Sequence, residues 1–437
     1  MSVRRPITRE QWSWAVYDAA NSAYALCILA GFYPIFFSKF WTAGLAEDEA
    51  IFLQNLSVSA AGLTLALLAP FLGALAENWG GRKRLLAIVT VLGALAGSLL
   101  ALPDEGDWPA AFAIYVVSTV CFYAAILFYD ALLTTVATPV ERHRLSGVGY
   151  ACGYFGSVVL FLFCTFLVQQ PQVFGLADES SGIRVAFILT GAWWMFFALP
   201  LFLIVKEPPR PRPPLTQAIA ISLGSLKATA LEIVRTPRVF WFLLAYWFYI
   251  DGVHTLITTA TAFGEKLGLE TGSLLAALIV VQVVGIFSAF FMGRAGDAFG
   301  PRKVIGAMLV VYLAVAWIAS QLTPEPWDFL LFEMPPVYLM AALIGLAQGG
   351  VQVLSRSYYA NIVPPDRAAA FFGFYNMLGR SAAILGPLVA GFVSRATGDI
   401  RNGIVSVGAL FIIGLVLLIY TRRYDRTKGV LDATDPA

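Results

Sequence analysis

Three polar side chains share one face of the first long apolar run in the chain. Asp18, Asn21 and Ser22 lie three or four residues apart, a spacing that makes them neighbours on a helix. A carboxylate in hydrocarbon costs roughly 2.5 to 3.5 kcal/mol on insertion scales, so a membrane chain keeps one only where it faces protein or water. This face is therefore predicted to line a hydrated path, with Asp18, Asn21 and the adjacent Tyr17 as candidate substrate ligands.

A second polar stripe lies on the first apolar run of the second half. Asp251, His254 and Thr255 follow i, i+3 and i+4 spacing. Histidine changes charge near neutral pH, so His254 together with Asp251 can carry a proton. The alternative interpretation makes Asp251 a structural partner of Arg380. Asp130, inside another apolar run, is a further candidate, for proton coupling or for an inner gate.

A third stripe combines two amides with a guanidinium. Gln348, Gln352 and Arg356 are spaced i, i+4 and i+8. An arginine with flanking amides offers planar, bidentate recognition of a carboxylate. An ionic lock between the two halves, with Asp18 as one partner, explains the same arginine equally well, since buried charges are normally paired. Arg356 and Arg380 are therefore both candidate substrate ligands, and the sequence leaves open which of them forms a lock.

The composition that surrounds these stripes is that of a membrane protein. Hydrophobic residues make up 59% of the chain and charged residues 13%, against about 25% charged in an ordinary soluble domain. Many apolar runs are long enough to cross a hydrocarbon layer of roughly 30 Å as helices. Twelve spans are predicted, at 12–40, 51–76, 85–102, 109–137, 145–169, 184–205, 239–263, 272–295, 303–322, 336–362, 368–394 and 402–421.

The loops between these spans predict orientation and division. Loops on one side hold most of the lysines and arginines, whereas the other side has acidic clusters such as residues 47–49. By the positive-inside rule both termini lie in the cytoplasm. A proline-rich stretch after the sixth span favours an extended linker. We predict a six-helix bundle at 1–205, a cytoplasmic linker at 206–238 and a second six-helix bundle at 239–437.

The two halves share a loop motif, which indicates an internal repeat. The first copy joins spans 2 and 3 and the second joins spans 8 and 9. Glycines permit close helix approach, and the acid can bond a neighbouring arginine or helix end in one conformation only. We therefore expect a gating role, beyond topology, for both copies. Their residues are Gly73, Glu77, Arg82 and Lys83 in the first copy, and Gly293, Asp297, Arg302 and Lys303 in the second.

This motif resembles the signature of the major facilitator superfamily. Several stretches also resemble one branch of it, which contains the fungal vacuolar amino-acid effluxers of autophagy and bacterial relatives. They are residues 14–22, 149–156, 345–357 and 372–375, followed by Gly386 and Pro387. The resemblance implies an all-α membrane protein, built as two pseudo-symmetric six-helix bundles whose substrate site lies near mid-membrane. It also implies export of amino acids or similar small solutes.

The sequence thus predicts a proton-coupled secondary transporter in the cytoplasmic membrane, working by alternating access. The chain has no phosphate-binding Gly-Lys-Ser/Thr loop, no nucleophile motif and no metal-ligand spacing, so we expect no enzyme activity, cofactor or metal. Expected partners are a small-molecule substrate, the lipid bilayer and protons, with no nucleic acid and with the chain as a monomer. Two rival functions remain: a multidrug or sugar-derivative exporter, and a non-transporting membrane sensor.

Overall fold

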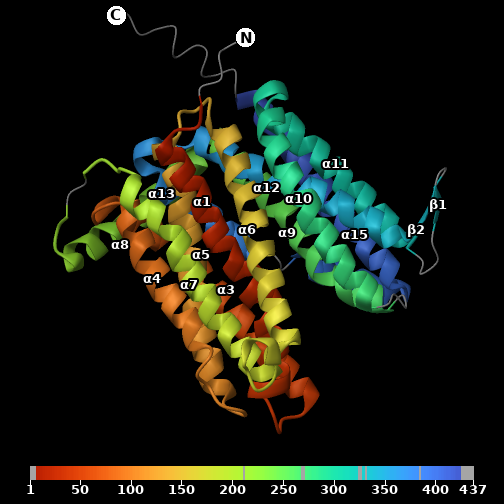
Figure 1. Ribbon diagram of the computed structural model, residues 1–437. Helices are drawn as coiled ribbons and strands as arrows, with labels where there is room; N and C mark the ends of the chain where they lie inside the picture. Colours follow the sequence, from red (N-terminus) through yellow and green to blue (C-terminus); the bar gives the residue numbers. More distant parts are fainter. Residues whose placement is uncertain are drawn as a thin grey trace, which may run out of the picture. The chain divides into compact units, whose positions relative to one another are not determined.

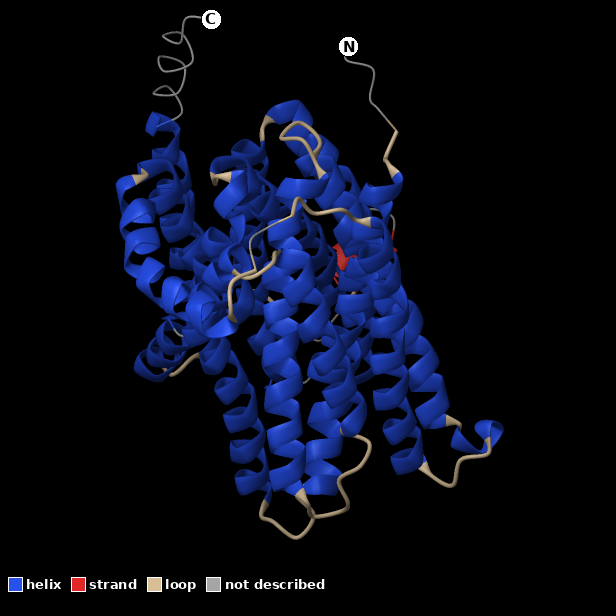
Figure 2. Ribbon diagram, turned by 90° about the vertical axis from the view of Figure 1, so that its left-hand side faces the viewer, coloured by secondary structure: helices blue, strands red, loops and turns tan. Residues whose placement is uncertain are grey.

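The computed structural model describes residues 6–209, 212–266, 271–322, 327–329, 332–382 and 385–424. Nearly all of them are helical (Figures 1 and 2). The first-half α-helices are α1 (Arg9–Tyr24), α2 (Tyr33–Phe36), α3 (Glu47–Asn78), α4 (Arg82–Leu99), α5 (Trp108–Val136), α6 (Arg142–Gln169) and α7 (Glu179–Ile204). They are followed by α8 (Leu215–Arg235), α9 (Pro237–Lys266), α10 (Thr271–Phe299), α11 (Pro301–Ser320), α12 (Pro336–Ile362), α13 (Ala368–Ser381), α14 (Leu385–Thr397) and α15 (Ile400–Tyr420).

Short elements complete the chain. Two π-helical segments, Ala25–Phe32 and Phe37–Trp41, flank α2, and 3-10 turns occur at Pro171–Phe174, Pro365–Arg367 and Thr421–Tyr424. The connection before α12 holds a small hairpin, β1 (Trp327–Phe329) with β2 (Phe332–Met334), whose antiparallel register pairs Trp327 with Met334. This hairpin is the one departure, among the described residues, from the predicted all-α class.

The chain packs as two compact units. The first comprises 1–139, 148–226 and 364–377, and the second comprises 140–147, 227–363 and 378–437. In the first unit α4 packs along α5 and α7, and α1 packs on α7; in the second α10 packs on α12, and α15 on α9 and α11. Each unit thus includes a short segment from the other half of the sequence, a feature that the predicted division at 206–238 did not contain.

Among the residues that the structure describes, twelve helical segments are long and apolar enough to span a membrane. All but one coincide with predicted spans; the exception is α8, inside the predicted linker. The predicted span at 85–102 is missing from this set because α4 has only 18 residues and begins with Arg82, Lys83 and Arg84. Since α4 packs along α5 and α7 as a span would, we retain α4 as a span and treat α8 as a linker helix.

Two predicted spans are not continuous α-helices. The first widens into π-helix on both sides of α2, where Pro34 supplies no backbone N–H. The eleventh, predicted at 368–394, divides into α13, which ends at Ser381, and α14, which begins at Leu385. Pro387 lies in the first turn of α14, where a missing N–H costs nothing. The kink expected at this proline is therefore a helix end followed by a new helix start.

Candidate functional site

The carboxylate of Asp18 is held between hydroxyl donors. Asp18 on α1 is buried, with 5% of its surface exposed. The Tyr129 hydroxyl on α5 donates to Asp18 Oδ2 at 3.2 Å, and the Ser22 hydroxyl donates to Oδ1 at 3.2 Å. Neutral donors from two helices therefore fix the orientation of a membrane-buried carboxylate.

Next to this carboxylate lies an unsatisfied acceptor. The amide oxygen of Asn21 is buried and has no hydrogen-bond partner among the described residues. Leaving a buried polar group unpaired costs roughly 1–3 kcal/mol, so such a group in a native fold calls for an explanation. Because residues three apart on a helix are neighbours, Asn21 and Asp18 present adjacent acceptors. A primary ammonium, with three donors, matches this set.

A glycine brings α6 against the same acceptors. A Cβ added to Gly153 would lie 2.6 Å from Ser22 Oγ and 3.1 Å from Asp18 Oδ1. Any larger residue would therefore displace the carboxylate. We call Asp18, Asn21, Ser22, Tyr129 and Gly153 the first half-site; all five belong to the first packing unit.

Tyr17, a predicted substrate ligand, is hydrogen-bonded to two neighbouring helices in this structure. Its side chain is fully buried. The Tyr17 hydroxyl pairs with Thr90 Oγ1 at 2.8 Å and accepts from Trp194 Nε1 at 3.3 Å, and its ring centroid lies 5.0 Å from that of Tyr129. The Tyr17 hydroxyl is thus bonded to α4 and α7, and its ring supports Tyr129 of the first half-site.

Asp251 binds a helix start. It is fully buried on α9, and its carboxylate accepts from the backbone N–H of Leu385 at 3.0 Å and of Gly386 at 2.8 Å. The Thr255 hydroxyl donates to the same carboxylate at 3.3 Å. The first N–H groups of a helix stabilise an anion, so α14 balances this charge. Within the described residues Asp251 forms no ion pair, which corrects the interpretation that it pairs with Arg380.

His254 holds the other side of the same helix break. Its Nδ1 lies 3.0 Å from the carbonyl oxygen of Ala382, which follows α13. Arg380, half-buried in the last turn of α13, acts electrostatically on His254. We call Asp251, His254, Thr255, Gly386 and Arg380 the second half-site. All five belong to the second packing unit.

The two half-sites occupy equivalent places in the repeat. One constant offset along the chain relates Asp18 to Asp251, Asn21 to His254, Ser22 to Thr255 and Gly153 to Gly386. A Cβ on Gly386 would meet Asp251 Oδ1 at 2.7 Å, just as one on Gly153 would meet Asp18. The difference is in the facing helix: α6 continues through Gly153, whereas Gly386 is the second residue of α14, which begins at Leu385.

Arg356 contacts the start of α6. Its side chain is 2% exposed, Nε donates to Ser146 Oγ at 3.0 Å, and Nη2 donates to the Ser146 carbonyl at 2.9 Å. Ser146 comes from the first half of the sequence but lies in the second unit. Gln348 and Gln352 are half-buried on the same helix, and Asp130 is buried on α5.

The first copy of the repeated loop forms a dense ionic cluster. Arg82 is 1% exposed and donates to Glu77 Oε1 at 3.2 Å and to the carbonyl of Pro365 at 2.5 Å. Glu77 also accepts from the backbone N–H of Ala369, at the start of α13, at 2.7 Å. On the other side Glu207 accepts from the backbone N–H groups of Arg82 and Lys83 at 3.1 and 3.0 Å. Lys83 Nζ donates to the Val205 carbonyl at 2.5 Å.

The second copy is more exposed. Arg302 donates to Thr421 Oγ1 at 3.4 Å, whereas Asp297 and Lys303 are exposed. Gly80 in the first copy and Gly300 at the matching position of the second have left-handed backbones, with φ of 79° and 88°. That conformation, which other residues adopt only with strain, explains why glycine recurs at this position.

Gly293 makes a close helix crossing in the second unit. A Cβ there would lie 2.6 Å from the carbonyl oxygen of His143, and one on Gly147 would lie 2.5 Å from that of Ala289. The start of α6 therefore packs directly on the backbone of α10.

The first unit contains the equivalent crossing. A Cβ on Gly73 would collide with the carbonyl of Ala369, and one on Gly373 would lie 2.6 Å from the carbonyl oxygen of Ala69. The start of α13 thus packs on α3 as the start of α6 packs on α10.

Two arginines that the sequence did not single out clamp equivalent helix ends. Arg184 on α7 donates to the carbonyls of Ala101 and Pro103 at 2.6 and 2.9 Å. Arg401 on α15 donates to those of Ser320 and Leu322 at 3.1 and 3.0 Å. Each guanidinium thereby satisfies carbonyls left open where α4 or α11 ends.

Removing one clamp should destabilise the fold without touching either half-site. We expect Arg184→Ala to lower the free energy of unfolding by about 1–3 kcal/mol, because two carbonyls lose a charged donor. Thermal unfolding of the purified protein in detergent measures the loss. Arg395→Ala, at an exposed position on α14, is the control. Equal stability of the two variants would contradict the clamp.

Several contact residues had only faint sequence signals. Glu207 is the single acid beside the prolines that end the sixth span, and His143 is one of only two histidines. Tyr129 was one tyrosine among many on cavity-type spans. Their partners lie more than 100 positions away, so no local pattern revealed them.

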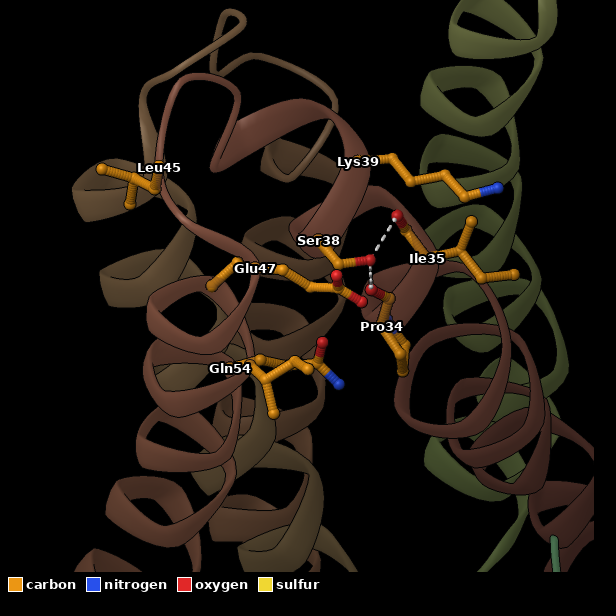
Figure 3. Close-up of a pocket in the computed structure, with 9 residues that line it drawn as sticks. Pro34, Ile35, Ser38, Lys39, Leu45, Glu47 and Gln54 are labelled. Carbon is orange, nitrogen blue, oxygen red and sulfur yellow. Dashed lines mark hydrogen bonds between the residues drawn. The ribbon is translucent and has the colours of Figure 1, made fainter. Parts of the chain in front are cut away.

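A surface cavity lies away from these groups. It has a volume of about 480 Å³ and is formed by the end of the first span and the first turns of α3 (Figure 3). Ser38 Oγ in its wall donates to the carbonyls of Pro34 and Ile35. Glu47 and Lys39 at its rim are exposed, and no predicted site residue lines it.

Comparison with known proteins places the chain among transporters. The family described as "Vacuole effluxer Atg22 like" matches residues 7–433. A Bacillus subtilis protein named "Uncharacterized MFS-type transporter YxiO" is 31% identical over 422 residues, covering 94% of this chain and 95% of that protein. Autophagy-related protein 22-1 of Aspergillus niger is 25% identical over 306 residues, covering 66% of this chain and 48% of the fungal protein, so the match spans about half of its length.

Solved structures show the same fold. The proton:xylose symporter XylE has a TM-score of 0.70 at 16% identity, covering 94% of each chain. The major facilitator transporter FucP, in its outward conformation, has a TM-score of 0.71 at 14% identity, covering 95% of this chain and 99% of that one. Together with the twelve candidate spans and the repeated half-sites, these likenesses show that the chain belongs to the Atg22-like vacuole-effluxer family of the major facilitator superfamily, and that it is a multi-pass membrane transporter and not an enzyme.

Proposed function

We propose that this transporter exports a small zwitterionic solute, such as an amino acid, from the cytoplasm by alternating access coupled to protons. The observation that carries this proposal is the first half-site, where the unpartnered amide oxygen of Asn21 adjoins the carboxylate of Asp18. An ammonium donates to both acceptors, and the carboxylate balances its charge. The family's description as vacuole effluxers supports the transport of a small solute across a membrane.

The second half-site supplies the remaining roles. Arg380 and Arg356 are both proposed as candidate ligands for a carboxylate group, and Arg356 also donates twice to Ser146. Asp251 and His254 are the proposed proton carriers. Asp251 can release the N–H groups of α14 when it is protonated, because a neutral carboxyl is a weaker acceptor than a carboxylate. Proton binding would thereby be linked to the position of α14.

A direct test uses the purified chain in liposomes. Counterflow of labelled amino acids should be rapid, and should be competed by unlabelled amino acids but not by sugars or cationic drugs. Selective counterflow of sugars or drugs would favour the rival exporter, and no counterflow of any class would favour a sensor. Thermal shift gives an independent readout, because a ligand that binds the folded state raises the melting temperature.

Asp251→Asn tests the coupling role. We expect efflux driven by a pH gradient to fall by about 10-fold or more, since a charged hydrogen-bond acceptor contributes roughly 1.5–3 kcal/mol. Counterflow, which needs no net proton movement, should decline much less.

Asp399→Asn is the matched control. Asp399 caps the start of α15 through the backbone N–H of Arg401 at 2.8 Å, but it is exposed. Asparagine caps about as well as aspartate, so this variant should transport normally. Unchanged pH-driven efflux in Asp251→Asn would remove the coupling role.

A further inference from the structure

A buried histidine that the proposed transport cycle does not use lies at the start of α6. His143 is 7% exposed and belongs to residues 140–147, which pack in the second unit. Its Nδ1 lies 2.7 Å from Ser357 Oγ and its Nε2 lies 3.3 Å from Asn361 Nδ2, both on α12. Both ring nitrogens are therefore engaged across one helix contact.

An arginine fixes the direction of each of these hydrogen bonds. Arg142 Nη1 lies 3.1 Å from Asn361 Oδ1, and a guanidinium can only donate. The Asn361 oxygen is therefore the acceptor, and its NH₂ group points to the ring of His143. Nε2 must then accept, which places the ring proton on Nδ1.

The chain of bonds ends on the backbone. Nδ1–H of His143 donates to Ser357 Oγ, whose own proton goes to the Val353 carbonyl at 2.8 Å. The Ser357 hydroxyl also lies 3.4 Å from the Leu354 carbonyl, so its proton goes to the backbone in either case. These bonds are consistent with a neutral imidazole that has its proton on Nδ1.

A second proton on this ring would break the contact. Nε2–H would face the NH₂ group of Asn361, so that two donors would oppose each other. The charged residues along the elements near His143 are mainly cationic: Arg142 and Arg144 on its own helix, Arg356 on α12 and Arg294 on α10. The acids are Glu141, just before α6, and Asp297 on α10. Their balance also disfavours an imidazolium.

The repeat provides an internal comparison. Gly293 packs on the carbonyl of His143 as Gly73 packs on that of Ala369, so the two residues hold equivalent places. Alanine suffices for the crossing in the first unit. The imidazole in the second unit is thus an addition to the packing, and histidine is the side chain that, when exposed to water, changes its charge near neutral pH.

We propose that His143 is a proton-binding site whose occupation releases the start of α6 from α12. The site holds its helix contact when the imidazole is neutral and loses it in acid. This places a proton-responsive element beside the Arg356–Ser146 contact, separate from Asp251 and from the substrate.

Hydrogen–deuterium exchange of the full chain in nanodiscs, without substrate, tests the site. A released imidazole has an ordinary pKa of about 6.5, so lowering the pH from 8 to 5.5 favours release by about tenfold. After correction for intrinsic exchange, protection of residues 142–147 should fall by that factor. Protection of residues 369–377, at the equivalent crossing without a histidine, should not change.

Two variants separate proton binding from simple packing. His143→Ala reproduces the first-unit crossing, which has alanine at this place. The hydrogen-exchange protection of residues 142–147 in this variant should be the same at pH 8 and pH 5.5. In Asn361→Asp a carboxylate accepts from both Arg142 and a protonated ring, so the contact should persist at pH 5.5. Unchanged protection in the parent, an equal fall in His143→Ala, or a tenfold fall in Asn361→Asp would each overturn the assignment.

Discussion

Asp18→Asn should reduce counterflow of the transported amino acid by at least about 30-fold. Removing one partner of a buried charged contact costs about 2–5 kcal/mol, because the ammonium of the substrate keeps its desolvation cost and loses the balancing charge. The hydroxyls of Tyr129 and Ser22, which now donate to the carboxylate, would also face an amide. Initial counterflow rates in liposomes of matched protein content measure the loss.

Two further variants make this result specific. Asp104→Asn, on an exposed loop of the same half, should transport as the parent does, since the Asp104 side chain is 94% exposed and its contact at 3.5 Å is with Arg184, outside the first half-site. Gly153→Ala keeps the Asp18 carboxylate but should displace it. The new Cβ would lie 2.6 Å from Ser22 Oγ, which donates to this carboxylate, and 3.1 Å from Asp18 Oδ1. We expect an intermediate loss there. Near-parental counterflow in Asp18→Asn would exclude the first half-site as the ammonium site.

Gly73→Ala should strongly disfavour the conformation in which α13 packs on α3. The new methyl would collide with the carbonyl of Ala369 and lie 3.1 Å from the Cα of Ala370, and backbone atoms cannot move aside as a flexible side chain can. Overpacking of this kind costs about 1–3 kcal/mol, which changes the population of that conformation by roughly 5- to 150-fold. Faster hydrogen exchange at residues 369–377 and slower transport are the expected readouts.

The same helix provides the control for this prediction. Gly62, also on α3, has open space where a Cβ would be added. Gly62→Ala should leave exchange and transport unchanged, and should stabilise the helix slightly, since alanine has the higher helix propensity. If both variants behaved alike, the effect would come from helix propensity, and the packing role of Gly73 would be wrong.

Much of the architecture followed from local patterns. Apolar length predicts where helices can cross a membrane, and the matched loops predict the repeat, because both signals lie within a few tens of residues. The polar stripe of Asp18, Asn21 and Ser22 was likewise visible, since helical spacing alone puts these residues on one face. The same reasoning placed Asp251, His254 and Thr255 together on α9.

Other features depended on contacts between distant segments. The sequence indicated a kink near Pro387, but only the packing of α9 on α14 shows that Asp251 binds the new helix start. The sequence indicated that the buried charge of Arg356 would need a partner, but only the structure shows that its guanidinium donates to the hydroxyl and the carbonyl of Ser146. Such contacts escape local patterns, because a backbone N–H or carbonyl occurs at every position in the sequence.

What the sequence by itself determined is therefore the transporter class, the helical spans with their repeat, and the helix faces that carry the scarce charges. Tertiary structure alone decided which group balances each charge, where the eleventh span divides, and which segments cross between the packing units. The physical reason is that hydrophobicity and helical periodicity are properties of neighbouring residues. The partner of a buried carboxylate or guanidinium is a segment that lies far away in the sequence. Glycines at close helix crossings determine which distant backbone can approach closely enough to bond it.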